Sequence, residues 1–259
     1  MNIKTKKEGL SVEERVNYLV DWMRDYVNEA EANGVIVGVS GGIDSALAAS
    51  LMKKAFPDNS LGVIMPIQKS LEDQPDALNL VKKLELPYYG IELTNTFNEQ
   101  MNVIEQSLGD RWNKETDQIV RANLMARIRM STLYAIAQNF GYLVVGTGNK
   151  AEIYTGYFTK HGDGASDIEP LRNLTKTEVY RMAEYLGVPN AILTKKPSPD
   201  LWEGQTDEGE MGVTYAHIDA HLRGEDIPQE SLNTIQALHQ QTGHKRQMAP
   251  GPAPFKKED

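Results

Sequence analysis

Residues 35–45 read VIVGVSGGIDS, and this stretch decides the expected fold of the chain. Its first half, VIVGVS (35–40), is a short run rich in β-branched apolar residues, which is typical of a strand buried in a parallel sheet. Gly41 and Gly42 then permit a tight turn, and ALAASLMKKAF (46–56) predicts a helix soon afterwards. The stretch therefore predicts a strand, a glycine turn and a helix, with any ligand at the carboxyl end of the strand.

The same alternation of elements continues on both sides of this stretch. An amphipathic helix is expected at 11–31, where Ser11 and Glu14 fit a capping box. Further strands are predicted at 61–66, 88–93 and 142–147, and further helices at 72–84, 95–107 and 117–139. Because alternating strands and helices form βαβ units with right-handed crossovers, we expect an α/β fold, a Rossmann-like parallel sheet with flanking helices. No repeat or linker divides the sequence, so residues 1–259 are expected to form a single domain.

The sequence changes in character after Thr147. Residues 148–174 and 194–209 are polar and lack apolar periodicity, so we predict two long loops that are mobile without ligand and ordered with it. Thr175 and Glu178 open a capped helix between these loops. Two more helices are predicted, near 210–223 and 228–242. The proline-rich tail after them is expected to be mobile at its end.

Composition and charge exclude several classes of protein. The chain contains no cysteine, which excludes disulfides, thiolate zinc sites and cysteine nucleophiles. Its formal net charge is -9, whereas proteins that bind nucleic acid need a positive surface to meet the phosphates. The N-terminal segment MNIKTKKEGLSVEERV has no apolar stretch of the signal-peptide type, and no apolar run approaches membrane-spanning length. We therefore expect a soluble cytoplasmic protein, with neither nucleic acid nor a membrane as partner.

The turn SGGIDS (40–45) combines the groups that bind a metal–phosphate complex. Its two glycines let backbone N–H groups approach an anion, and the following helix directs the positive end of its dipole to the same place. Ser40 and Ser45 add hydroxyl donors. The carboxylate of Asp44 would repel phosphate unless a divalent cation lay between them, so the turn predicts Mg²⁺ with the phosphate. No lysine follows the glycines as a Walker A loop requires, and the remaining alternative is an ordinary glycine-rich turn.

Several motifs in order carry a resemblance to a known family. SGGIDS resembles the SGGxDS signature of the PP-loop ATP pyrophosphatases, which have the adenine nucleotide alpha-hydrolase-like fold. Later segments are similar to those of the ammonia-dependent NAD synthetases within that group. They are NLMARIRM (123–130), GTGNKAE (146–152), TGYFTKHGDGASD (155–167) and the pair Pro170-Leu171. The resemblance extends from about residue 35 to Arg246, and several separated motifs in order are more specific than one.

The resemblance implies a reaction, its substrates and one cofactor. The nicotinate carboxylate of deamido-NAD would attack the α-phosphate of ATP, giving an adenylated intermediate and pyrophosphate. Ammonia would then attack the acyl carbon and release AMP and NAD. Mg²⁺ is the implied cofactor, and a homodimer the implied assembly. No protein nucleophile is needed, so the work of the site would be charge neutralisation and positioning.

The resemblance also implies roles for individual residues. Asp44, Glu152 and Lys176 would be catalytic, with Asp44 and Glu152 as the Mg²⁺ ligands. ATP would be bound by Ser40, Gly41, Gly42, Asp44, Ser45, Thr147, Lys176 and Ser198. Deamido-NAD would be bound by Asn123, Arg127, Lys160, Asp163, Asp167, His244 and Lys245. Each also has a structural alternative, such as a solvated helix face for Arg127 or a turn-forming role for the two aspartates.

Three departures from the family pattern and three rival functions remain to be weighed. Ile43 stands where many members have glutamine, Ser198 where they often have threonine, and residues 66–76 match poorly, so no adenine contacts are assigned there.

Among PP-loop enzymes, sulfur transfer to tRNA favours cysteines and a basic surface, and a GMP synthetase normally carries a cysteine-dependent glutaminase. A non-catalytic nucleotide-binding protein would have no use for Asp44 and Glu152 as paired metal ligands.

The nitrogen source follows from the missing cysteine. Glutaminase domains typically use a cysteine nucleophile, and only one amphipathic helix precedes the synthetase signature. We therefore expect the chain to use free ammonium and to ignore glutamine. A separate glutaminase subunit stays open as an alternative source of ammonia.

Overall fold

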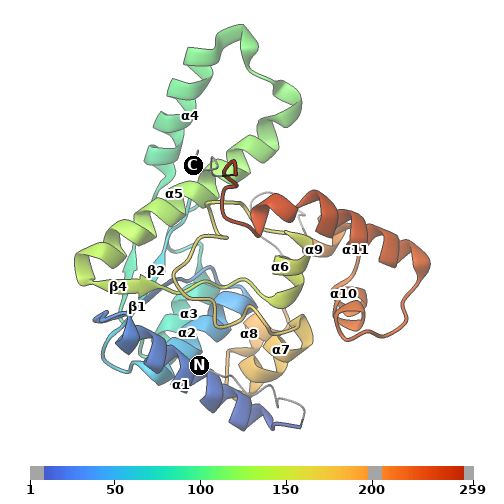
Figure 1. Cartoon of the computed structure of the whole chain (residues 1–259). Helices are drawn as coiled ribbons and strands as arrows, with labels where there is room; N and C mark the ends of the chain where they lie inside the picture. The colour runs from blue at the N-terminus through green and yellow to red at the C-terminus, as the bar shows by residue number, and fades with distance from the viewer. Residues whose placement is uncertain (1–8, 198–205, 254–259) are drawn as a thin grey trace, which may run out of the picture.

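The computed structural model describes residues 9–197 and 206–253, and a four-stranded parallel sheet lies at its centre (Figure 1). The strands are β1 (Gly34–Gly38), β2 (Ser60–Ile64), β3 (Tyr88–Gly90) and β4 (Tyr142–Val144), in the order β3-β2-β1-β4. Val35 is paired with Ser60 of β2 and with Leu143 of β4. All four strands predicted from the sequence are present, each shorter at its carboxyl end than predicted. The α/β class with a parallel sheet is therefore confirmed.

The strands are apolar throughout because both faces of the sheet are covered. Val35, Val37 and Val39 belong to the hydrophobic cluster on one face, whereas Ile36 belongs to the cluster on the other. Successive side chains of a strand point to opposite faces, so a run such as VIVGV supplies both cores at once. This double burial explains why the strands appear in the sequence as continuous apolar runs.

Helices form a layer on each face (Figure 1). α1 (Val12–Glu29), α2 (Ile43–Ala55) and α7 (Lys176–Tyr185) pack together against the cluster that contains Val35 and Val37. α4 (Thr94–Leu108) and α5 (Asp117–Phe140) cover the opposite face, where Phe97 and Ile128 are buried. The remaining α-helices are α3 (Pro75–Lys83), α6 (Lys150–Thr155), α8 (Asn190–Leu193), α9 (Asp207–Met211), α10 (Tyr215–Leu222) and α11 (Gln229–Gln241).

The strand order creates a natural ligand site between β1 and β4. The chain runs from β1 to β2 and β3 on one side, and β4 returns to the other side of β1. Ligands in open α/β sheets bind at such a switch point, outside the carboxyl ends of the strands. The turn after β1 (39–42) and the segment after β4 (145–149) therefore begin next to each other.

Three details of the sequence prediction are wrong. Residues 148–174 are not one irregular loop, because α6 lies within them, and α8 was not predicted at all. The helix predicted near 210–223 is divided into α9 and α10, since Gly212 has φ of +66° and ends α9. No described helix is long and apolar enough to cross a membrane.

The helices α4 and α5 also form an arm that extends away from the sheet (Figure 1). Two short 3-10 turns, η1 (Gly109–Arg111) and η2 (Lys114–Thr116), connect the helices at its tip. Arg121 of α5 joins the two helices through its ion pair with Glu105 of α4, and it also pairs with Asp117 of its own helix. Large apolar side chains are nevertheless exposed along the arm, at Val103, Leu108 and Ile119.

Candidate active site

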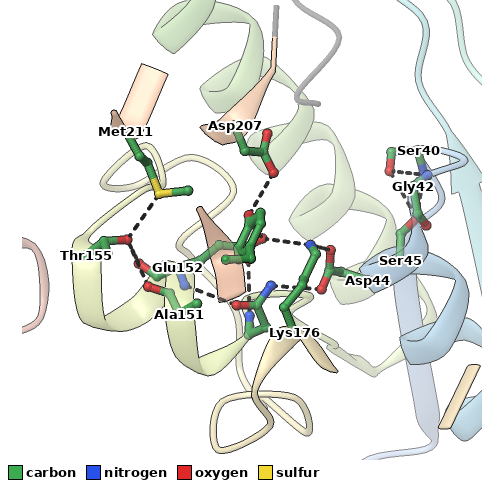
Figure 2. A network of polar contacts seen from close by, with 12 residues as sticks. Ser40, Gly42, Asp44, Ser45, Ala151, Glu152, Thr155, Lys176, Asp207 and Met211 are labelled. Atoms are coloured by element: carbon green, nitrogen blue, oxygen red, sulfur yellow. Dashed lines mark hydrogen bonds and ion pairs between the residues drawn. The ribbon is translucent and has the colours of Figure 1, made fainter. Parts of the chain in front are cut away.

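The turn after β1 is built by glycines and by hydroxyl–backbone hydrogen bonds. Gly41 has φ of +81°, a conformation that disfavours other residues, and a Cβ there would lie 3.0 Å from the Cβ of Asp76. The Ser40 and Ser45 hydroxyls lie 3.0 Å apart, and Gly42 N donates to Ser40 Oγ (Figure 2). α2 begins directly after Gly42, and the first N–H groups of a helix have no partner inside it. The turn therefore presents backbone donors and a helix N-terminus to an anion.

Asp44, Glu152 and Lys176 meet at the edge of this turn (Figure 2). The ammonium Nζ of Lys176 lies 2.6 Å from Asp44 Oδ2 and 3.5 Å from Glu152 Oε1. They come from α2, α6 and α7, which are far apart in the sequence. The lysine side chain is 4% exposed and the two carboxylate side chains 17% and 16%, so the cluster is largely shielded but open on one side. The structure thus brings together the three residues predicted to be catalytic.

Asn149, which was not predicted as a site residue, connects the two carboxylates. Its side-chain amide donates to Asp44 Oδ1 over 2.9 Å. Asn149 also forms a capping box with Glu152, because its Oδ1 accepts from Glu152 N and its own N–H donates to Glu152 Oε2. Asn149 is fully buried. The N-x-x-E spacing of a capping box is present in the sequence. It predicts the start of α6 and the hydrogen bonds between Asn149 and Glu152.

Asp207 and Tyr215 are two further residues that the sequence reasoning did not identify. The Tyr215 hydroxyl lies 2.7 Å from Asp207 Oδ2 and 3.2 Å from Glu152 Oε1. The ring of Tyr215 lies 4.6 Å from Lys176 Nζ. Both residues are buried; Asp207 is at the start of α9 and Tyr215 is at the start of α10. They extend the cluster to three carboxylates around one lysine.

The charges in this cluster perturb one another. Burial raises the pKa of Glu152, and the nearby charge of Asp44 raises it further, in spite of Lys176. Burial also raises the pKa of Asp207. Burial alone would lower the pKa of Lys176, but the charges of Asp44 and Glu152 raise it above its ordinary value. The cluster has three carboxylates and one ammonium group, so a bound cation would be stabilised there by the excess of acidic groups.

Two of these carboxylates, Asp44 and Glu152, could hold a metal ion whose remaining ligands are phosphate oxygens or water molecules. Carboxylate oxygens are the donors that Mg²⁺ prefers, and Asp44 and Glu152 face the same pocket. Within residues 9–197 and 206–253, no group of three or more His, Cys, Asp or Glu side chains is arranged to hold a metal by itself. Mg²⁺ commonly takes one or two carboxylates and completes its shell with phosphate oxygens and water, which suits this arrangement.

The helix that carries Lys176 is fixed at its first turn. Thr175 and Glu178 form the predicted capping box. Asp219 of α10 accepts hydrogen bonds from Lys176 N, Thr177 N and the Thr177 hydroxyl, at 3.1, 2.9 and 2.7 Å. Asp219 is 1% exposed, so its carboxylate acts as a buried anchor at the positive end of α7. The lysine thereby projects from a rigid position.

Asp219→Ala is expected to destabilise the protein by about 2–3 kcal/mol, because three donors at the start of α7, one of them buried, lose their charged acceptor. Urea unfolding of the two proteins measures this difference. The control is Asp21→Ala, which removes an exposed aspartate paired with Arg24 on α1 and should change the free energy of unfolding by less than about 0.5 kcal/mol. Equal stability of the Asp219→Ala and Asp21→Ala proteins would show that α7 does not need this anchor.

The cluster lines one side of a pocket of about 600 Å³. The ATP-side residues predicted from the sequence that line the pocket are Ser40, Gly42, Asp44, Ser45, Thr147, Glu152 and Lys176. Asn123, Asp163 and Lys245 line it on the opposite side. A single pocket thus contains most of the predicted ATP-binding residues and three of the seven predicted deamido-NAD-binding residues.

The opposite side of the pocket is held by segment 156–163 against α5. The Thr159 hydroxyl donates to Asn123 Oδ1 over 2.7 Å, and Thr159 N donates to Asp163 Oδ1 over 3.0 Å. Lys245 Nζ donates to the carbonyl oxygens of Gly156 and Phe158. Burial raises the pKa of Asp163 and lowers that of Lys245. The basic run near the C-terminus is therefore docked on this segment.

Among the described residues, five predicted site residues do not line the pocket. Arg127 is exposed and donates to Lys160 O over 3.3 Å, and Lys160 Nζ donates to His244 O over 2.7 Å, so these three are linked to one another. Asp167 accepts hydrogen bonds from Val144 N and the Tyr134 hydroxyl, which ties it to β4. Gly41 shapes the turn without facing the pocket, and Ser198 lies outside the described residues.

Known proteins of one family are similar to this chain in sequence and in fold. The model of the NAD synthase family matches residues 15–249. The NH₃-dependent NAD⁺ synthetase of Alkaliphilus oremlandii (strain OhILAs) is 49% identical over 244 residues, which cover 93% of this chain and 98% of that protein. The structure of NMN synthetase from Francisella tularensis has a TM-score of 0.87 at 40% identity and covers 94% of this chain and 99% of its own. The NH₃-dependent NAD synthetase of Campylobacter jejuni has a TM-score of 0.76 at 28% identity and covers 94% and 100%. The chain therefore belongs to the NAD synthase family.

Proposed function

We propose that the chain is an ammonia-dependent NAD synthetase that converts deamido-NAD, ATP and ammonia into NAD, AMP and pyrophosphate. A carboxylate oxygen of the nicotinate attacks the α-phosphorus of ATP, and the bond to the bridging oxygen of pyrophosphate breaks. Ammonia then attacks the acyl carbon, loses a proton and displaces AMP. The observation that carries this proposal is the meeting of Asp44, Glu152 and Lys176 beside the glycine turn, in a pocket that is also lined by three acceptor-side residues, Asn123, Asp163 and Lys245.

The ATP phosphates would lie over the turn that follows β1. Backbone N–H groups at the start of α2 and the Ser40 and Ser45 hydroxyls would bind them. Asp44 and Glu152 would hold Mg²⁺, which when bound supplies positive charge between the carboxylates and the phosphates. Lys176 would reach the phosphates from α7 and stabilise the charge that develops on pyrophosphate as it leaves. Thr147 lines the same side of the pocket.

Deamido-NAD would occupy the side of the pocket formed by Asn123, Asp163 and Lys245. Hydrogen bonds connect Arg127, Lys160 and His244 to one another, and these three residues would act at the rim of the pocket. Asp167 would contribute less to binding, since its carboxylate already accepts a hydrogen bond from Val144 N of β4. Nicotinate and the phosphates of the dinucleotide are anionic, which suits the cationic side chains gathered there.

Arg127→Ala is expected to raise the KM for deamido-NAD about tenfold with little change in kcat, because a charged hydrogen-bond donor at the rim is lost in ground and transition states alike. Steady-state kinetics with saturating ATP and ammonium measure the two constants. Arg24→Ala is the matched control, because Arg24 lies on α1 and donates to Ala55 O and Lys54 O at the surface. Unchanged kinetics in Arg127→Ala would assign Arg127 to a solvated helix face.

We also propose that the arm formed by α4 and α5 mediates a homodimer. Val103, Leu108 and Ile119 are 64%, 45% and 52% exposed, and apolar side chains grouped along a projecting arm are typical of subunit interfaces. Ile119 also lines the pocket, so a second copy on the arm would border the acceptor side. Light scattering after gel filtration measures the mass, and Val103→Asp should shift it toward that of the monomer.

The nitrogen donor provides the direct test of the proposed function. NAD formation by the purified protein is measured with ATP, Mg²⁺ and deamido-NAD, with either ammonium chloride or ammonia-free glutamine. Product with ammonium and none with glutamine is expected, since the chain has no cysteine for a glutaminase. Comparable rates from glutamine would contradict ammonia dependence. No product from either donor in a folded protein would contradict the NAD synthetase function itself.

A second acceptor is favoured by the similarity to the Francisella tularensis NMN synthetase, which this chain matches over 99% of that chain. Nicotinate mononucleotide carries the same reacting carboxylate as deamido-NAD and lacks the adenylate half. The two functions are separated by the ratio of kcat/KM for the two acceptors, measured with ammonium and ATP. A ratio above ten for deamido-NAD is expected, and a ratio below one would make mononucleotide amidation the main activity.

A further inference from the structure

We propose that Tyr215 is a positioning residue of the reaction, which orients Glu152 through its hydroxyl and Lys176 through its ring. This inference rests on the proposed function, because it assumes that these two side chains serve adenylation. Tyr215 would touch neither substrate. It would act by fixing the two groups that hold the metal and the phosphates.

The hydroxyl of Tyr215 fixes the second oxygen of Glu152. Glu152 Oε2 accepts from Asn149 N over 3.1 Å, and Oε1 lies 3.2 Å from the Tyr215 hydroxyl. The hydroxyl has a single hydrogen, which it shares between Glu152 Oε1 and Asp207 Oδ2. A carboxylate held at both oxygens in this way cannot rotate about its terminal bond without losing a hydrogen bond. The pair of contacts therefore determines the direction in which Glu152 presents its free electron pairs to the pocket.

The ring of Tyr215 supports the ammonium of Lys176. The distance from Nζ to the ring centroid is 4.6 Å, within the range of a cation–π contact, and both side chains are buried. Asp44 holds the same ammonium from the other direction at 2.6 Å. A lysine has many rotamers in solvent, so a ring and a carboxylate on either side strongly restrict where its charge lies.

The position of Tyr215 is itself fixed by four sets of contacts. Its backbone N–H donates to Glu208 Oε1 over 2.8 Å, and its hydroxyl lies 2.7 Å from Asp207 Oδ2. Thr214 caps the helix α10 immediately before it. The cluster of Ala151, Met211, Val213, Ile218 and Ile235 surrounds it with buried apolar side chains. Tyr215 thus connects α9, which follows the segment containing Ser198, to the catalytic cluster.

A purely structural tyrosine would show a different response to substitution. Filling the core requires the ring, whereas positioning Glu152 requires the hydroxyl. Tyr215→Phe removes only the hydroxyl, and Tyr215→Leu removes the ring as well. Tyr154→Phe is the matched control, because Tyr154 packs against the same apolar cluster and bonds His221 through its hydroxyl, 3.2 Å away, without touching Glu152 or Lys176.

The experiment combines kinetics with metal binding in the full-length protein. Kinetics give kcat, the KM for ATP and for the acceptor, and the Mg²⁺ concentration at half-maximal rate. Electron paramagnetic resonance measures Mn²⁺ binding in the presence of α,β-methylene-ATP, which is not turned over. Thermal melting reports whether each variant is folded.

Tyr215→Phe should raise the Mg²⁺ requirement and weaken Mn²⁺ binding by about 10-fold, as expected for a hydrogen bond to a charged group. Its KM for deamido-NAD should stay within about twofold of the wild-type value, because the hydroxyl contacts Glu152 and none of the residues proposed to bind deamido-NAD. Tyr215→Leu should in addition raise the KM for ATP about fivefold, through the lost contact with Lys176. Tyr154→Phe should match the wild type in all these constants.

Two results would overturn the inference. One is a folded Tyr215→Phe protein with wild-type Mn²⁺ binding and Mg²⁺ requirement. The other is equal effects of Tyr215→Phe and Tyr154→Phe, which would show that both act through the shared core. If the wild-type protein makes no NAD, the proposed function fails, and Mn²⁺ binding with the ATP analogue still decides whether Tyr215 positions the metal-binding carboxylate.

Discussion

Replacement of Asp44 by asparagine is expected to lower the rate of adenylation by about 10²–10³-fold, the loss typical for a group that stabilises developing charge. The substitution keeps the shape of the side chain and removes its negative charge. Asp44 then no longer attracts the cation that separates carboxylates from phosphates, and it no longer neutralises Lys176, which lies 2.6 Å away. Pyrophosphate release in the presence of ATP, Mg²⁺ and deamido-NAD measures the rate.

The control for Asp44→Asn is a carboxylate near the same turn that does not face the pocket. Asp76 lies beside Gly41 and pairs with Lys195 over 3.5 Å. Asp76→Asn should retain the wild-type rate within about threefold, since an exposed ion pair contributes little. Circular dichroism shows whether both proteins are folded. A folded Asp44→Asn protein with a near wild-type rate would remove Asp44 from the mechanism.

The sheet could be predicted because each strand carries its own signal. β1 and β2 are buried on both faces, so their sequences are continuous apolar runs. Runs of this length are typical of buried strands and are too short for a helix. β3 is only three residues long and exposed at the edge, yet proline and the flanking helices still delimit it. The turn at 40–45 was predicted to bind phosphate for an equally local reason, since its glycines, hydroxyls and carboxylate are adjacent in the sequence.

The rest of the cluster could not be derived from local patterns. α6 is six residues long, which is too short to show helical periodicity, and only the spacing of Asn149 and Glu152 marks it. Tyr215 reaches Glu152 across 63 positions of sequence, and this contact depends on how α10 packs against α6. Gly212 ends α9, and Thr214 caps the start of α10 two residues later. A glycine and a threonine at this spacing are a signal that divides the predicted helix near 210–223 into two.

The acceptor side shows the opposite limitation. Resemblance identified Arg127, Lys160 and His244 as a set, and the structure links them by hydrogen bonds through backbone carbonyls. Sequence motifs do not show whether a side chain points to a pocket or to a neighbouring segment. Asp167 has the residue type expected of a ligand-binding position, but Val144 N and the Tyr134 hydroxyl already use its carboxylate.

Lys176→Met is expected to have two linked effects. The rate should fall by about 10²–10³-fold, because the leaving pyrophosphate loses a fixed positive charge. The metal-free protein should also lose about 3 kcal/mol of stability, since removing one partner of a buried ion pair leaves the others uncompensated. Asp44, Glu152 and Asp207 would then be three carboxylates without a cation among them.

The stability effect identifies Lys176 as the group that neutralises the metal ligands when no metal is bound. Mg²⁺ binding to the folded state alone would stabilise it by an amount that grows with the metal concentration. Melting temperatures without nucleotide should therefore rise with Mg²⁺ much more in Lys176→Met than in the wild type, where the ammonium competes for the same oxygens. Lys53→Met is the control, because Lys53 is only partly buried, lies outside the pocket and bonds only Pro57 O among the described contacts. Identical Mg²⁺ responses in all three proteins would mean that Lys176 and the cation do not share Asp44 and Glu152, and the metal would then have to be bound elsewhere.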